Sequence, residues 1–325
     1  MKFPHRRQFF RLAAGVAAFP ALSRIASAQT YPSRPVRLIV AYPPGGASDI
    51  LARLIAQWLS ERLGQEFVIE HRPGAGSNIG TEAVVKAPAD GHTLLMVSTA
   101  HAINPTLYTD LNFNFIRDIA PVVGFIRSND VILVNPSFPA KTVPEFIAYV
   151  KANPSKVNFA SGGNGSVGHV TGELLKMMTS VNMVHAPYRG VALALTDLIG
   201  GKVQVVFATM PATIESIKAG TVQALAVTTA TRSEVLPDIP TMGEFVPGFE
   251  ASSWYGIGVP KDTPAEIVDK LNGEINASLA DSKIKARLSD LGSTIIGGSP
   301  ADFGKLIAEE TEKWAKVVKF SGAKA

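Results

Sequence analysis

Residues 36–49, VRLIVAYPPGGASD, join a continuous apolar run to a loop rich in proline and glycine. The run Val36–Tyr42 predicts a buried strand, because strands covered on both faces lack polar alternation. After the loop, residues 48–63 repeat apolar side chains at the three- and four-residue spacing of a helix. A strand, a tight loop and a helix form the unit of parallel sheets, so this stretch predicts an α/β fold.

The same alternation continues along the chain. Apolar runs predict further strands at 67–70, 93–97, 131–134, 157–160, 203–207, 224–227 and 254–259. Helical spacing predicts helices at 169–179 and 214–218, and Thr142, Thr263 and Ser299, each before or near a proline, predict three more helix starts. A chain of 325 residues is long enough for two domains of roughly 100–200 residues each.

The charge of the chain is concentrated at its beginning. Residues 1–28 hold five basic residues and no acid, so the net charge of +4 falls to −1 for the remaining 26 basic and 27 acidic residues. This balance argues against a nucleic-acid partner. The chain has no cysteine, which excludes disulfides, thiolate metal sites and cysteine nucleophiles.

Residues 1–28 have the parts of an export signal: a basic start, an apolar stretch at 12–22 and the small residues Ala26-Ser27-Ala28. The apolar stretch is too short for a membrane span, which needs about 20 residues. We therefore predict a signal peptide over 1–28 and a periplasmic protein. Arg6–Arg11 resembles the twin-arginine export box, although His5 stands where serine or threonine is usual, so both export routes stay open.

Four strand-to-helix junctions are rich in small and polar residues. They are Pro43–Asp49, Gly74–Gly80, Ser98–Asn104 and Ser161–Gly168. In a parallel sheet such loops lie at the carboxyl ends of strands, where ligands bind. Helix N-termini there offer unpaired N–H groups and the positive end of the helix dipole. Together the loops predict a binding cleft for an anion.

The fourth loop, Ser161–Gly168, has a second interpretation. Gly163, Gly165 and Gly168 match the dinucleotide fingerprint G-x-G-x-x-G between a strand and a helix. The fingerprint also needs an acid about 20 residues later, and residues 185–189 contain none. Arg189 suits a 2′-phosphate, so an exported NADP-dependent oxidoreductase remains the alternative function.

The residues of known catalytic motifs are absent. The sequence has no G-x-S-x-G elbow, no H-E-x-x-H and no cluster of metal ligands, so we predict no metal site. The histidines are scattered singly, and only His101 and His169 lie in the glycine-rich loops. Asp49 either favours the helix start and ties down the loop or contacts a ligand. Trp254-Tyr255 belongs either to the core or to a cleft wall.

The chain resembles the substrate-binding proteins of tripartite tricarboxylate transporters, also called the Bug (Bordetella uptake gene) family. Six strings in order carry the resemblance across the mature chain: Tyr31–Val36, Tyr42–Asp49, Glu70–Gly80, Ala89–Leu94, Pro187–Gly190 and Trp254–Gly256. The resemblance implies a type II periplasmic-binding-protein fold of two lobes, each a mostly parallel sheet flanked by helices, with the ligand cleft between them. It implies one lobe of residues 29–129 and 250–325, and the other of residues 130–249.

The resemblance also implies the ligand and the partners. Family ligands are small carboxylates: di- and tricarboxylates, aromatic acids and related organic acids. The resemblance implies a binder rather than an enzyme, without a cofactor and expected as a monomer, that delivers its solute to the membrane subunits of the transporter. The implied first-lobe ligand residues are Tyr42, Pro44, Gly45, Gly46, Ala47, Ser48, Asp49, Asn78, Ser98, Thr99 and His101. The second-lobe residues are Ser161, Asn164, Ser166, His169, Tyr188, Arg189 and Thr209.

The sequence departs from the family pattern at Ala208-Thr209-Met210-Pro211, where many relatives have Asp or Asn shortly before the proline. This departure favours a less polar far end of the ligand. Because the glycine-rich loops contain few basic residues, we also expect neutral donors, rather than one salt bridge, to hold the ligand carboxylate.

Overall fold

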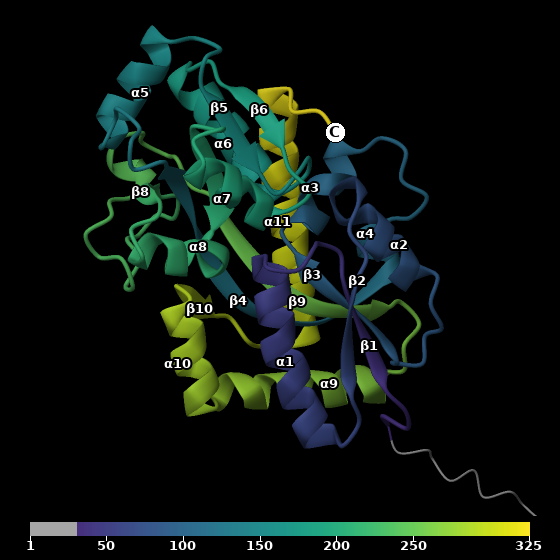
Figure 1. The fold of residues 1–325 in the computed structure, drawn as a ribbon. Coiled ribbons are helices and arrows are strands. Elements are labelled where there is room, and N and C mark those ends of the chain that lie inside the picture. Colours follow the sequence, from purple (N-terminus) through teal and green to yellow (C-terminus); the bar gives the residue numbers. More distant parts are fainter. Residues whose placement is uncertain (1–30) are drawn as a thin grey trace, which may run out of the picture. The chain divides into compact units, whose positions relative to one another are not determined.

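The computed structural model describes residues 31–325 (Figure 1). The signal peptide predicted at 1–28 and its twin-arginine box lie outside the described residues. Within residues 31–325, no helix has both the length and the apolar composition that a membrane span requires.

Ten strands form one connected sheet in the order β2-β1-β3-β9-β4-β7-β5-β6, and β8 and β10 also pair with β4. The strands are β1 (Val36–Val40), β2 (Phe67–His71), β3 (Thr93–Ser98), β4 (Ile119–Val134), β5 (Asn158–Ser161), β6 (Val184–Pro187), β7 (Val205–Thr209), β8 (Gln223–Val227), β9 (Ser252–Pro260) and β10 (Ser293–Ile295). Parallel pairs join β1 to β2 and β3, and join β5 to β6 and β7. The strands between these two triplets pair antiparallel.

The long strand β4 connects two groups of strands: the first group is β1, β2, β3, β9 and β10, and the second group is β5, β6, β7 and β8. Its residues 119–129 pair with β9, whereas residues 130–134 pair with β7 on one side and β8 on the other. The sequence predicted only 131–134 as strand, which was too short. Pro121, Gly124 and the polar run 127–130 interrupt the apolar pattern of this strand, and the pairing register shifts near the first two.

Helices cover both groups of strands (Figure 1). They are α1 (Ala47–Leu63), α2 (Asn78–Val85), α3 (Ala100–Leu107), α4 (Phe115–Asp118), α5 (Val143–Ala152), α6 (Val167–Thr179), α7 (Val191–Ile199), α8 (Met210–Lys218), α9 (Ala265–Ala280), α10 (Ser282–Asp290) and α11 (Pro300–Ser321). The hydroxyls of Thr142 and Ser299 cap α5 and α11 as predicted. The capping role of Thr263 was wrong, since its hydroxyl donates to the carbonyl of Pro260 instead.

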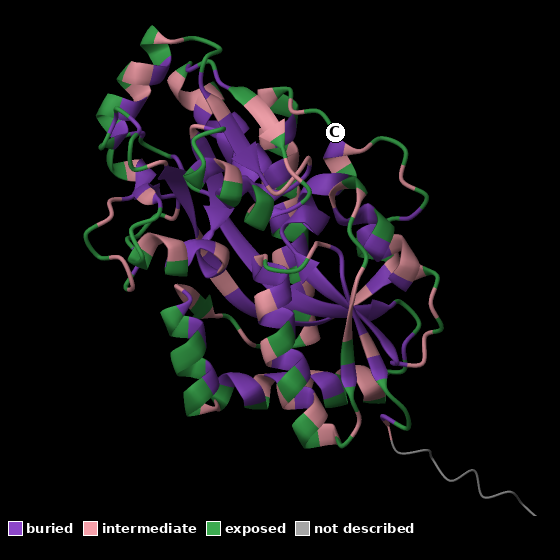
Figure 2. Cartoon of the chain, in the orientation of Figure 1, coloured by how far each residue is buried: buried purple, intermediate pink, exposed green. Residues whose placement is uncertain are grey.

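The core lies along the strands, which Figure 2 shows as mostly buried, whereas α1, α9 and α10 alternate buried and exposed stripes. Helix α11 contacts α3, α6 and β4 and so packs against both groups of strands. Its Trp314 is completely buried, as is Trp254 of β9. The burial of these two tryptophans stabilises the packing of α11 against both groups of strands.

Candidate functional site

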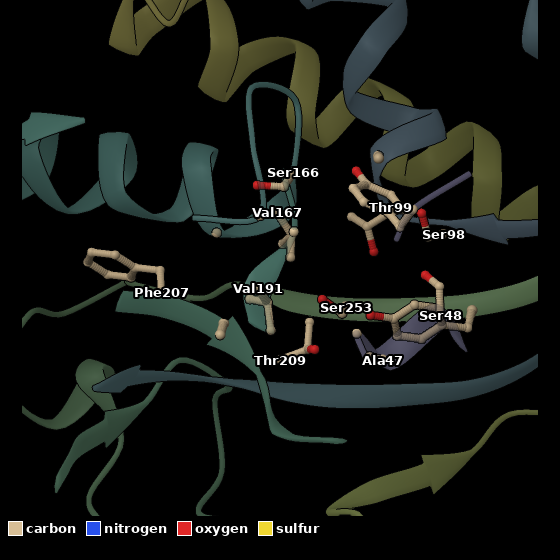
Figure 3. A pocket seen from close by; sticks show the side chains of 18 of the residues that line it. Ala47, Ser48, Ser98, Thr99, Ser166, Val167, Val191, Phe207, Thr209 and Ser253 are labelled. Carbon is tan, nitrogen blue, oxygen red and sulfur yellow. The ribbon is translucent and has the colours of Figure 1, made fainter. Parts of the chain in front are cut away.

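The strand ends and helix starts of both groups surround one pocket (Figure 3) with a cavity volume of about 70 Å³. One water needs about 10–15 Å³ of such space, so the cavity suits a small organic molecule. The first residues of α1, α3, α6 and α7 line it, and so does Thr209, which directly precedes α8. Five helix N-termini therefore meet at this pocket.

The lining carries no charged side chain. Its polar side chains are all hydroxyls, from Tyr42, Ser48, Ser98, Thr99, Ser166, Thr209, Ser253 and Tyr255. Helix N-termini present unpaired N–H groups and positive dipole ends. This combination favours a small anion held by neutral donors.

Eight of the residues expected at the ligand line this pocket: Tyr42, Gly46, Ala47, Ser48, Ser98, Thr99, Ser166 and Thr209. Ser166 also builds its own loop, because its hydroxyl donates to the carbonyl of Gly163 (2.7 Å) and accepts from the amide of His169 (3.3 Å). The hydrogen of the Ser166 hydroxyl is thus turned toward the protein. Met210 is fully buried in the core and absent from the pocket lining.

A second hollow, which we call the vestibule, shares Tyr42, Pro43 and Gly162 with the pocket and has a volume of about 770 Å³. Three further expected residues line it: Asn164, Tyr188 and Arg189. The Tyr188 hydroxyl donates to Asp197 (2.8 Å), and Arg189 is the one charged side chain of this lining. The vestibule therefore offers a positive charge at the approach to an uncharged pocket.

The other expected residues lie outside the pocket and the vestibule lining: Pro44, Gly45, Asp49, Asn78, His101, Ser161 and His169. Asp49 is 4% exposed, and its carboxylate accepts from the Gly45 amide (3.0 Å) and contacts His71 (2.9 Å) and Arg53 (3.0 Å). It ties down the first glycine-rich loop, which is the first of its two interpretations. Asn78 accepts from the amide of Asn104 (2.9 Å).

Both ring nitrogens of His101 are occupied inside the protein. Nδ1 accepts from the Ser98 amide (3.0 Å), and Nε2 lies 3.0 Å from the Thr81 hydroxyl. Because the ring is buried, its pKa is lowered to about 4. His101 is therefore neutral at neutral pH and supports the loop behind Ser98.

His169 has a similar supporting position in the second group. Its ring stacks on His185 with centroids 4.1 Å apart, and His185 contacts the Ser161 hydroxyl (2.8 Å). Burial lowers the pKa of His169 to about 4 and that of His185 to about 3. This uncharged stack lies behind the loop that carries Ser166.

Several lining residues were missing from the expected set: Pro43, Ala100, Gly162, Val167, Gly168, Gly190, Val191, Phe207, Ala208, Ser253 and Tyr255. Strand alternation was the available signal on β9, since it puts Ser253 and Tyr255 on one face and Trp254 on the other. Trp254 packs on Phe303 (5.7 Å between centroids). Trp254 therefore belongs to the core, whereas Tyr255 lines the pocket.

The glycines of the G-x-G-x-x-G pattern have packing roles. Gly168 is the third of them, and a Cβ there would lie 2.2 Å from the carbonyl oxygen of Phe207, so only glycine lets α6 begin this close to β7. A Cβ on Gly165 would lie 2.5 Å from Oδ1 of Asn104 in the first group. These contacts explain two of the three glycines without a dinucleotide.

Comparison with known proteins identifies relatives over nearly the whole chain. The family model described as the tripartite tricarboxylate transporter family receptor matches residues 51–322. Protein BugT of Bordetella pertussis is 38% identical over 97% of this chain and 98% of its own. No support for an oxidoreductase comes from these matches.

Two solved structures of Rhodopseudomonas palustris proteins superpose closely. Rpa4515 with adipate has a TM-score of 0.88 and 38% identity, covering 90% of this chain and 99% of that one. MatC with bound malate has a TM-score of 0.84 and 31% identity, covering 89% and 100%. These likenesses confirm the predicted two-lobed periplasmic-binding-protein fold.

Proposed function

The chain belongs to the tripartite tricarboxylate transporter receptor family, and on that premise we propose that it captures a small carboxylate and delivers it to the membrane subunits of such a transporter. The family resemblance that the sequence indicated is thereby confirmed. The related structures hold adipate and malate, which are both dicarboxylates. An aliphatic dicarboxylate is therefore the ligand class that we propose for this chain.

One observation carries the proposal: five helix N-termini and eight hydroxyl side chains surround a pocket without a charged side chain. Hydrogen bonds to a charged ligand contribute about 1.5–3 kcal/mol each. Micromolar affinity corresponds to about −8 kcal/mol, so several such bonds suffice once the ordering costs are met. Binding of this strength allows release to a transporter.

The two lobes are proposed to comprise residues 29–129 with 250–325, and residues 130–249. The change of partners within β4 at residues 129 and 130, and the start of β9 at Ser252, support these boundaries. Closure of the lobes on the ligand would shift the population by the preference of the ligand for the closed state. We further propose a periplasmic monomer without enzymatic activity, exported by the signal at 1–28.

The test is a thermal-shift titration of the mature protein, residues 29–325, with adipate, malate, succinate and citrate, and with adipamide as an uncharged match for adipate. We expect a dicarboxylate to raise the Tm, adipamide to leave it unchanged, and the acid to be recovered chemically intact. A Tm that no carboxylate moves would refute the proposed function.

The variant Arg189→Ala distinguishes two possible sources of ligand affinity, namely neutral donors in the pocket and one salt bridge to Arg189. If pocket amides and hydroxyls hold the carboxylate, the variant keeps its affinity within about tenfold, since Arg189 lines only the vestibule. Loss of binding in this variant alone, with binding retained in Ser166→Ala, would show instead that one salt bridge holds the ligand.

A further inference from the structure

The floor of the pocket lies over a buried acid that the ligand cannot contact directly. Asp130 stands where β4 changes partners, opposite Thr209 of β7, and it is 1% exposed. Ser253, on the neighbouring strand β9, lines the pocket directly (Figure 3). One serine hydroxyl thus separates the cavity from Asp130.

The hydrogen bonds of this pair determine what Ser253 offers to a ligand. The Ser253 hydroxyl donates its single hydrogen to Oδ1 of Asp130 over 2.7 Å. Oδ2 of Asp130 has no hydrogen-bond partner among residues 31–325. In this arrangement Ser253 presents only lone pairs to the cavity, and lone pairs repel a carboxylate. In this state the Ser253 hydroxyl at the floor therefore opposes the ligand class proposed above.

We propose that Asp130 is a positioning residue for the ligand: protonation of Asp130 frees the Ser253 hydroxyl to donate to a bound carboxylate, so that capture takes up one proton. The inference rests on the proposed function, because it needs an anionic ligand. No covalent bond changes. A proton from solvent binds the Asp130 carboxylate, the new Asp130 hydroxyl donates to the oxygen of Ser253, and the hydrogen of Ser253 turns to the ligand.

The surroundings of Asp130 favour such a change near neutral pH. Burial raises its pKa to about 7, against the lowering effect of the Ser253 hydrogen bond. Lys313 lowers the pKa of Asp130 and Glu310 raises it, both from α11. Tyr255 on β9 is a further titratable neighbour, and Arg127 of β4 pairs with Glu310 (3.4 Å). Strands β7, β8 and β10 contribute no titratable side chain. A bound carboxylate adds a negative charge beside Ser253, which favours the protonated form further.

The experiment is isothermal titration calorimetry of the mature protein with the dicarboxylate that gives the largest Tm shift among adipate, malate and succinate. Titration at pH 7.5 in phosphate and in Tris measures the protons exchanged, because these buffers differ in ionisation enthalpy. Because an acid with a pKa of about 7 is already partly protonated at pH 7.5, we expect uptake of up to about three quarters of a proton per ligand at that pH, and a dissociation constant that rises up to about tenfold per pH unit between pH 7.5 and 9.

Asp130→Asn is the decisive variant, because its amide can donate to Ser253 at any pH. We expect it to bind with the low-pH affinity of the wild type and without proton exchange between pH 6 and 9. Thr209→Val is the matched control: it removes a pocket hydroxyl opposite Asp130, so it should change the affinity and keep the proton uptake. If Asp130→Asn does not fold, Ser253→Ala tests the same inference. That variant removes the bond that lowers the pKa of Asp130, so uptake at pH 7.5 should fall well below the wild-type value.

Two outcomes overturn the inference, and they are distinguishable. If a dicarboxylate binds with the same pH dependence in the wild type and in Asp130→Asn, Asp130 has no positioning role, while the proposed function stands. If no dicarboxylate binds either protein at any pH, the proposed function fails and takes this inference with it.

Discussion

Asp49 and Asp130 are two carboxylates buried beside the same pocket. Asp49, the wall acid, lies behind the wall formed by Ala47 and Ser48, and Asp130, the floor acid, lies beneath Ser253 at the floor. Asp49 accepts from the Gly45 amide and contacts both Arg53 and His71. Burial alone raises the pKa of Asp49, but these partners outweigh it and hold that pKa below its ordinary value. Among residues 31–325, the Asp130 carboxylate has only the Ser253 hydroxyl as a hydrogen-bond partner, and burial raises its pKa to about 7.

This difference teaches that the donors around a buried acid, rather than its depth, decide its charge state. Two of the three partners of Asp49 are local, because Gly45 and Arg53 lie four residues from it, and His71 adds a contact from the end of β2. They fix the negative charge, and the charge in turn fixes the loop. Asp130 lies on a strand whose own amides belong to the sheet, so its charge remains free to change. The wall is therefore a rigid part of the site, and the floor is the part that can respond to a ligand.

The prediction with the largest expected effect tests whether Asp130 lacks partners that would lower its pKa to the ordinary value. A pKa raised from 3.8 to about 7 stabilises the folded protein at low pH, and this contribution is lost as the pH rises through about 7. Relative to Asp130→Asn, the wild type should lose about 3 kcal/mol of unfolding free energy between pH 5 and pH 8. Urea denaturation at four pH values measures this difference.

Asp49→Asn is the control for that measurement. The lowered pKa of Asp49 stabilises the fold above its unfolded-state value, and this contribution is lost only when the pH falls through the folded-state pKa. The difference between the wild type and Asp49→Asn should therefore be constant from pH 5 to pH 8. If Asp130→Asn also gave a constant difference, the two acids would be equivalent and the comparison would be wrong.

The second prediction removes the wall acid. Asp49→Ala leaves the Gly45 amide and the side chains of Arg53 and His71 without their acceptor. We expect a loss of about 2 kcal/mol in unfolding free energy and about tenfold weaker ligand binding, because Ala47 and Ser48 of the same turn line the pocket. Asp49→Asn keeps one acceptor for Gly45 and should lose less of both. Unchanged affinity in Asp49→Ala would show that the loop keeps its shape without this carboxylate.

The third prediction removes one half-buried partner of the wall acid. His71 lies at the end of β2 and contacts Asp49 over 2.9 Å. His71→Ala should cost about 1 kcal/mol, and His71→Gln, which retains a donor, should recover part of it. Chemical denaturation at pH 7 compares the two variants. An equal loss in both would mean that packing of the ring, and not the hydrogen bond, is what stabilises the loop.

The sequence was sufficient for the features whose causes are local. Residues 36–63 specify a strand, a glycine loop and a helix within one stretch, and Asp49 lies in the first turn of that helix. The glycine-rich loops likewise predicted where helix N-termini meet. What the sequence did not specify was the floor, because Ser253 and Asp130 are 123 positions apart and meet only through the pairing of β4 with β9.

The missed elements have a related cause. Helices α3 and α7 begin at pocket loops without a clear capping residue, since the Thr99 side chain makes no capping hydrogen bond and Gly190 has no side chain to make one. The first part of β4 carries Pro121, Gly124 and Arg127, which resemble a loop until the neighbouring strands are known. The pairing of β4 with β9 overrides the local preference of these residues for a loop. The same pairing brings Asp130 beneath Ser253 at the pocket floor.

The smallest effect separates the exposed partner of Asp49 from the buried ones. Arg53 pairs with Asp49 over 3.0 Å, but its side chain is 60% exposed. Water and salt screen such a pair, and exposed pairs four residues apart on a helix contribute about 0.3–0.5 kcal/mol. Arg53→Ala should lose no more than this, and 0.5 M salt should remove most of the difference. Lys86→Ala is the matched control, because Lys86 pairs with Glu82 at the same spacing and is 70% exposed, away from the pocket. If Arg53→Ala cost as much as Asp49→Ala, the arginine would be the main partner of the wall acid, and the amide of Gly45 would not be what holds the first loop against the ligand.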